Sequence, residues 1–182
     1  MEEKIASPPY DVINSAEARQ MAEGNPHTFL HVIKPEIDLP ENIDLYSDEV
    51  YATARNNFVK MQENGWLVRE EVPALYLYRQ IMNGHSQIGI VVGASVNEYE
   101  NNLIKKHEFT RKKKEDDRTR HVAEVNANAG PVFLTYRSLS AIDELVDEMV
   151  QTDPLYDFTA PDGIQHTVWV VSGEEDVIKF QE

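Results

Sequence analysis

The sequence predicts an α+β protein, a single domain with a mainly antiparallel sheet and helices packed on it. Two apolar runs, residues 74–82 and 86–96, are separated by Asn83-Gly84, and both turn residues tolerate the positive φ angles of a tight hairpin. Two more short apolar runs flank Pro161-Asp162-Gly163 near the C-terminus. Helix-like segments do not alternate with these strands in a βαβ rhythm, which favours an antiparallel sheet.

The N-terminal part of the chain is predicted to contain a short helix and a longer one. Asn14 or Ser15 begins the first, because both side chains can accept hydrogen bonds from first-turn N–H groups, and Gly24-Asn25-Pro26 ends it. The longer helix begins at Ser47, carries carboxylates in its first turn and has apolar residues at helical spacing. Gly65 ends this second helix.

The remaining elements are predicted from short apolar runs and from the residues that interrupt them. Residues 29–33 and 132–136 are predicted as short strands, and residues 34–46 as a loop. Ser140 and Asp143 form a capping-box pattern at the start of a helix with an apolar face. The other predicted elements are a helix at about 116–128, strands at 155–159 and 165–171, and a short C-terminal helix.

Composition and charge restrict the classes of function. The chain of 182 residues is 41% hydrophobic, enough to bury a core, and it contains no cysteine that could form a disulfide or a thiolate metal site. No apolar run approaches the roughly 20 residues that span a bilayer, and the polar N-terminus does not resemble a signal peptide. We therefore expect a cytoplasmic protein. A net charge of −15 disfavours binding to nucleic acid or to an anionic membrane.

One segment, Lys105–Arg120, reverses this charge. It holds eight basic and four acidic residues, a net charge of +4, whereas the rest of the chain has 9 basic and 28 acidic residues. Such a local reversal of sign can attract an anion such as phosphate, with lysines as point charges and arginines as bidentate donors. The alternative is a solvated surface loop that leads into a helix, since most charge runs are solvated.

The pair His107-Glu108 lies within this basic segment. It resembles the start of a zinc-protease motif, but Arg111 occupies the position of the second histidine, so metalloprotease chemistry is disfavoured. No recognised metal-ligand spacing is present, and we expect no metal site in this chain. Cationic neighbours would lower the pKa of the Glu108 carboxyl and keep it ionised, which suits a proton acceptor. The four histidines His27, His31, His85 and His166 are interpreted as core or surface residues without a role in chemistry.

Seven sequence blocks, in this order, resemble the domain of unknown function 1015 family of bacterial and archaeal proteins. The blocks are SPPYDV at 7–12, NPHTFLHV at 25–32, ALYLY at 74–78, IKKHEFT at 104–110, EDDR at 115–118, GPVFLTY at 130–136 and LYDF at 155–158. The resemblance covers almost the whole chain. It implies that residues 1–182 are the N-terminal domain of a longer protein, whose C-terminal part includes a DGHHR block.

The same DGHHR block occurs in ParB-like free-serine kinases, which phosphorylate the serine hydroxyl with a nucleotide. Those kinases also carry a Lys-x-His-Glu segment, and Lys105-Lys106-His107-Glu108 is similar to it residue for residue. The resemblance implies that Glu108 is the general base, and we expect His107 beside it to be the second catalytic residue. The candidates that it suggests for substrate or phosphate binding are Lys106, Thr110, Arg111 and Arg118.

The expected function is therefore that of the N-terminal part of a small-molecule kinase that acts on free L-serine. Mg²⁺ and a nucleotide, ATP or ADP, are expected for the full-length protein and not for this chain alone. The expected partner is the C-terminal half of the same protein, without which turnover should be slight or absent. A non-catalytic module that binds a nucleotide or a phosphorylated metabolite is the alternative. A DNA-associated role, as in partition proteins with ParB-like folds, is disfavoured by the acidic charge.

Overall fold

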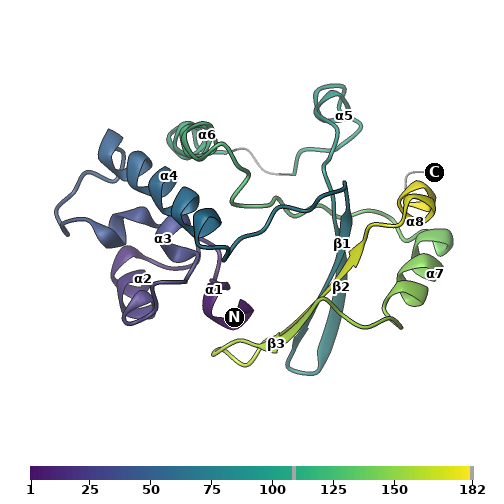
Figure 1. Cartoon of the computed structure of the whole chain (residues 1–182). Coiled ribbons are helices and arrows are strands. Elements are labelled where there is room, and N and C mark those ends of the chain that lie inside the picture. The colour runs from purple at the N-terminus through teal and green to yellow at the C-terminus, as the bar shows by residue number, and fades with distance from the viewer. Residues whose placement is uncertain (108–109, 181–182) are drawn as a thin grey trace. The chain divides into compact units, whose positions relative to one another are not determined.

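The computed structural model describes residues 1–107 and 110–180, which form helices and a four-stranded antiparallel sheet (Figure 1). The predicted α+β class is confirmed. Contacts within the chain divide it into two compact units, one built from residues 3–68 and 107–133 and the other from residues 69–106 and 134–182. Each unit is described below by itself.

The first unit is helical. Its elements are α2 (Ser15–Ala22), α3 (Leu30–Ile33), the 3₁₀ helix η1 (Pro35–Asp38), α4 (Asp48–Glu63) and α6 (Lys112–Val125), and the short helix α1 (Glu2–Ile5) begins the chain. Asn14 caps α2 in a reciprocal capping box with Glu17, as the sequence predicts. Gly65, with a φ of +67°, follows α4 in the left-handed conformation that ends many helices.

Helix α3 is central to the core of the first unit because it contributes apolar side chains to two clusters. Leu30 and Ile33 pack with Ala18 of α2 and with η1. Val32 instead packs against α4 and α6, where the other buried members of the cluster are Ala54, Met61 and Val125. Burial of such side chains contributes about 1.5–3 kcal/mol each. This packing fixes α3 between α2 and α4, and it therefore positions the side chains that α3 presents between them.

The second unit contains the sheet. Its elements are β1 (Leu75–Met82), β2 (His85–Val91), α5 (Val96–Glu100), α7 (Ser140–Met149), β3 (Tyr156–Thr159), β4 (Gln165–Val171) and α8 (Glu174–Lys179). The strand order is β2-β1-β4-β3, with every neighbouring pair antiparallel. The predicted hairpin is confirmed, since Asn83 and Gly84 join β1 to β2 with φ angles of 52° and 79°. Helices α7 and α8 cover one face of the sheet, where Leu77, Trp169 and Val171 are buried.

Several predicted elements are wrong. Residues 30–33 form a helical turn instead of a strand, because a short apolar run is compatible with either structure and its side chains here reach cores on two sides. Residues 132–136 form no strand: they pair with none of the four strands, and Val132 and Phe133 are 80% and 78% exposed. The helix predicted from residue 116 begins earlier, at Lys112.

Two local predictions in the second unit are also corrected. The residue that caps α7 is Leu139, so Ser140 does not form the predicted capping box, and the hydroxyl of Ser138 donates to Asp143 instead (2.6 Å). From the glycine within the second apolar run, a bulge or a close backbone approach at Gly89 is predicted, but the pairing of β1 with β2 runs through Gly89 without a bulge. Among the described residues, no helix is long and apolar enough to cross a membrane.

Candidate functional site

The sequence-predicted site residues lie in the segment that leads into α6 and along that helix. Glu108, the predicted base, lies outside the described residues. Its neighbours His107, Thr110 and Arg111 are all exposed. The Thr110 hydroxyl donates to Oε2 of Glu115 at 3.1 Å, and the Lys106 ammonium lies 4.5 Å from the centre of the Tyr99 ring.

Within the described residues, the cap residue of α6 makes no side-chain capping hydrogen bond. This cap residue is Arg111, in an extended conformation. The carbonyl of Arg111 accepts from the amides of Lys114 and Glu115, whereas the amides at the very start of a helix have no acceptor within it. Exposed lysines occupy positions 112–114. These cations add to the positive end of the helix dipole, and together they favour an anion.

Not every cation of the basic segment is available to a ligand. Lys112 pairs with Asp116 one turn along α6, and Arg120 pairs with Asp48 at the start of α4. The Asp116 carboxylate raises the pKa of the Lys112 ammonium. Arg111, Lys113 and Lys114 have no ion-pair partner within residues 1–107 and 110–180. The free positive charge is therefore concentrated at the amino end of α6.

Arg118 is the predicted binding residue with the most defined surroundings. Its guanidinium pairs with Asp117 at 2.8 Å and lies 4.2 Å from the centre of the Tyr10 ring. The other carboxylate oxygen of Asp117 accepts from the Tyr51 hydroxyl at 2.7 Å. Burial and this hydrogen bond to Asp117 raise the pKa of Tyr51. Arg118 is thus held in one orientation with 29% of its side chain exposed.

His121, three residues beyond Arg118, is part of the core. It is 3% exposed, and its Nε2 lies 2.9 Å from the carbonyl oxygen of Val32 in α3. Burial lowers the pKa of this imidazole, and the hydrogen bond to Val32 opposes that effect only in part. A neutral His121 that donates to a carbonyl links α6 to α3. In the part of the chain that the structure describes, no three acidic or histidine side chains are grouped so as to hold a metal ion.

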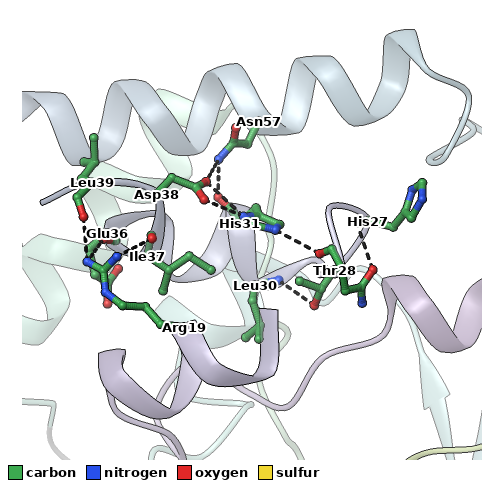
Figure 2. A network of polar contacts seen from close by, with 11 residues as sticks. Arg19, His27, Thr28, Leu30, His31, Glu36, Ile37, Asp38, Leu39 and Asn57 are labelled. Carbon is green, nitrogen blue, oxygen red and sulfur yellow. Dashed lines mark hydrogen bonds and ion pairs between the residues drawn. The ribbon is translucent and has the colours of Figure 1, made fainter. Parts of the chain in front are cut away.

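A second polar group, which the sequence analysis missed, surrounds His31 (Figure 2). Nδ1 of His31 lies 2.8 Å from Oδ1 of Asp38 in η1, and Nε2 lies 3.2 Å from the carbonyl oxygen of Asn25. The amide of Asn57 in α4 donates to Oδ2 of Asp38 and to the backbone carbonyl of His31, both at 2.8 Å. Arg19 donates to three backbone carbonyls at the end of η1, those of Glu36, Ile37 and Leu39.

The electrostatics of the His31 group favour an ion pair. The hydrogen bond to Asp38 raises the pKa of His31 and outweighs the effect of burial. Burial alone would raise the pKa of Asp38, but the hydrogen bonds from His31 and Asn57 lower it overall. Both shifts favour the charged forms. The imidazolium and the carboxylate are 20% and 33% exposed, so they are accessible from solvent.

Two shallow hollows lie on either side of this ion pair. One, of about 400 Å³, is formed by α2 and η1, and the other, of about 250 Å³, is formed by α4 and the residues around Trp66. His31 and Asp38 line both. No local signal in the sequence predicts these hollows, because the walls of the first come from Arg19 to Asp38 and those of the second from Pro26 to Trp66.

Comparison with known families decides the relationship of the chain. The profile of the family described as "Protein of unknown function (DUF1015)" matches residues 1–182. The chain belongs to the DUF1015 family. Comparison with curated proteins and with solved structures finds no match.

The structure of this DUF1015 chain brings together blocks that are separate in the sequence. Tyr10 of the first block contacts Arg118 of the EDDR block, and Val32 of the second block accepts from His121 just beyond it. These contacts lie within the first unit, which also contains the amino end of α6. Two of the predicted binding residues therefore join blocks in the described part of the chain: Arg118 contacts the first block, and Thr110 contacts Glu115 of the EDDR block.

Proposed function

We propose that this DUF1015 protein contributes the general base and an anion-binding helix end to a kinase that phosphorylates the hydroxyl of free L-serine. Glu108 is the base in this proposal, and a nucleotide, ATP or ADP, is the phosphate donor. A cytoplasmic location, where both substrates are available, is part of the proposal. The observation that carries it is the uncapped, cation-rich amino end of α6, which begins four residues after Glu108 in the sequence.

This arrangement suits the needs of phosphoryl transfer. The reaction requires positioning of the two oxygens in line and positive charge around the transferring group, with a carboxylate to orient the nucleophile. Arg111, Lys113 and Lys114, which have no ion-pair partner among the described residues, supply positive charge next to helix amides. Arg118 supplies an oriented guanidinium of the kind that binds a carboxylate or a phosphate.

The carboxylates of α6 are less suited to holding Mg²⁺. Asp116 pairs with Lys112, and Asp117 is engaged by Arg118 and by the Tyr51 hydroxyl. Magnesium sites in such enzymes commonly use one or two carboxylates together with substrate phosphates. We therefore assign no magnesium ligand to α6, and the proposed anion site does not depend on one.

The test is an assay of the product of the complete gene with Mg²⁺, L-serine and either ATP or ADP, in which O-phosphoserine is detected by ³¹P NMR. The proposal predicts phosphoserine formation. Arg111→Gln should raise the KM for the nucleotide about tenfold, as expected for the loss of a charged phosphate contact. Arg137→Gln, which removes an equally exposed arginine from the second unit, is the matched control and should leave the KM unchanged.

The alternative, a non-catalytic binding module, differs in a second measurement. Calorimetry of residues 1–182 with ATP, ADP, serine and phosphoserine reports binding without turnover. Tight nucleotide binding by this chain, with no phosphoserine formed by the complete gene product, would support the module and overturn the kinase proposal. The same cations at the amino end of α6 would carry the binding in either case.

A further inference from the structure

The smaller hollow beside His31 is lined by both cationic and apolar residues. The cationic residues are Lys60 of α4 and His31, and the apolar residues are Pro26, Met61 and Trp66. Asp38 and Asn57 complete the lining. All of these residues belong to the first unit, so the hollow is formed by one compact body.

The charges around this hollow sum to a positive value. Both ring nitrogens of His31 face oxygen acceptors, Asp38 on one side and the Asn25 carbonyl on the other. Only the doubly protonated ring can donate to both, so the geometry favours the imidazolium. Asp38 balances that charge. Lys60 is exposed and, within the described ranges, its ammonium has neither an ion pair nor a hydrogen bond, so it leaves a net charge of one. The net charge of the protein is −15, so a hollow with a net positive charge is a local site that attracts a small anion.

The apolar residues of the lining suit an apolar or flat group. Met61, one of these residues, is 3% exposed. The Trp66 ring is fixed by an edge contact with His27, at 4.1 Å between ring centres and 69° between planes. Aromatic walls of this kind bind planar groups through stacking and burial. At about 250 Å³ the hollow is smaller than the sites of drug-sized ligands, which begin near 300 Å³.

We propose that this hollow binds a small organic anion, in which a carboxylate faces Lys60 and His31 and a flat or apolar body packs against Trp66. The inference does not rest on the kinase proposal, because it uses neither Glu108 nor any residue of α6.

The test is an NMR titration of the indole N–H of Trp66 in the intact chain with benzoate, benzamide and acetate. Trp66→Phe assigns the resonance, and the indole of Trp169, which donates to the Thr152 carbonyl, is the internal reference. The proposal predicts that benzoate shifts the Trp66 signal in a saturable manner. Benzamide, which has the same ring without the charge, and acetate, which has the charge without the ring, should each bind at least about fivefold more weakly.

Two variants in α4 distinguish the effect of a positive charge at the hollow from the effect of a positive charge elsewhere on the same helix. Lys60→Met keeps the length of the side chain and should weaken benzoate binding about fivefold, the size expected for one partly exposed ion pair. Arg55→Met is the control, since Arg55 pairs with Glu124 and does not line the hollow. Equal binding of benzoate and benzamide, an equal effect of the two variants, or no shift of the Trp66 signal with any probe would each overturn the proposal.

Discussion

Nδ1 of His31 lies 2.8 Å from Oδ1 of Asp38, while the other ring nitrogen of His31 faces the carbonyl oxygen of Asn25 at 3.2 Å. The pair joins α3 to η1, and Asn57 extends it to α4. Because no acceptor-type nitrogen is left on the ring, His31 acts here as a cation instead of a general base. The group therefore contributes to the stability of the first unit and supplies charge to the adjoining hollow.

The first prediction concerns the pH dependence of stability. The raised pKa of His31 means that its contribution is fully present below about pH 6.5, its unfolded value, and is lost as the pH rises through the folded pKa. The lowered pKa of Asp38 means that its contribution is present above about pH 4 and is lost as the pH falls through its folded value. His31→Gln should therefore reduce the free energy of unfolding by about 1 kcal/mol at pH 5.5 and by less at pH 8.5.

Urea denaturation of the parent and the variant at both pH values checks this prediction. The difference between the two proteins isolates His31 from His121, whose lowered pKa has the opposite pH dependence. The other charged groups near the pair, Lys60 of α4 and Arg19 of α2, are common to both proteins. A destabilisation that is equal at the two pH values, or larger at pH 8.5, would contradict the ion pair.

The second prediction concerns Asn57. Replacement by alanine removes the donor to the Asp38 carboxylate and to the His31 carbonyl, and we expect a loss of about 1–2 kcal/mol in the free energy of unfolding. Asn56→Ala changes the preceding, exposed residue of the same helix and should be close to neutral. Chemical denaturation of the two variants measures the difference. Similar stabilities for both would show that Asn57 does not join η1 to α4.

The third prediction concerns Tyr51 and the orientation of Arg118. Tyr51→Phe leaves one oxygen of Asp117, a carboxylate that is 10% exposed, without its hydroxyl donor. We expect a loss of about 1–2 kcal/mol in stability. Tyr46→Phe is the control, because Tyr46 contacts Lys113 through its ring, which phenylalanine retains. Thermal unfolding compares them, and an equal effect of the two changes would argue against the hydrogen bond to Asp117.

The fourth prediction concerns the β1–β2 turn. Gly84 has a φ of +79°, and alanine in that conformation costs about 1 kcal/mol or more. Gly89→Ala should be neutral or slightly stabilising, because Gly89 lies within β2 without a positive φ and no atom lies within 4 Å of an added Cβ. The denaturant midpoint should fall for Gly84→Ala and should stay the same or rise slightly for Gly89→Ala. Equal destabilisation would contradict the turn geometry.

Local signals in the sequence identified most of the fold. The Asn83-Gly84 hairpin, the Asn14 cap and the Gly65 end of α4 each depend on residues within a few positions of one another, and the structure has all three. The predicted antiparallel sheet follows from the same kind of local pattern. The α+β class could therefore be predicted without knowledge of long-range contacts.

Elements whose structure depends on distant contacts could not be predicted. Residues 30–33 and 132–136 are both short apolar runs, and one is a helical turn while the other is exposed chain. The His31 group was missed because Asp38 and Asn57 approach it only through the packing of η1 and α4. Arg118 was predicted from charge, but its contacts with Tyr10 and, through Asp117, with Tyr51 come from tertiary structure.

The rate of phosphoserine formation by the complete gene product with Glu108→Gln tests the central proposal most directly. Glutamine keeps the size of the side chain but cannot accept the serine proton, and we expect the rate to fall about 100-fold or more. Glu100→Gln, an exposed carboxylate at the end of α5, is the control and should retain the parental rate. A Glu108→Gln protein as active as the parent would contradict the assignment of Glu108 as the base.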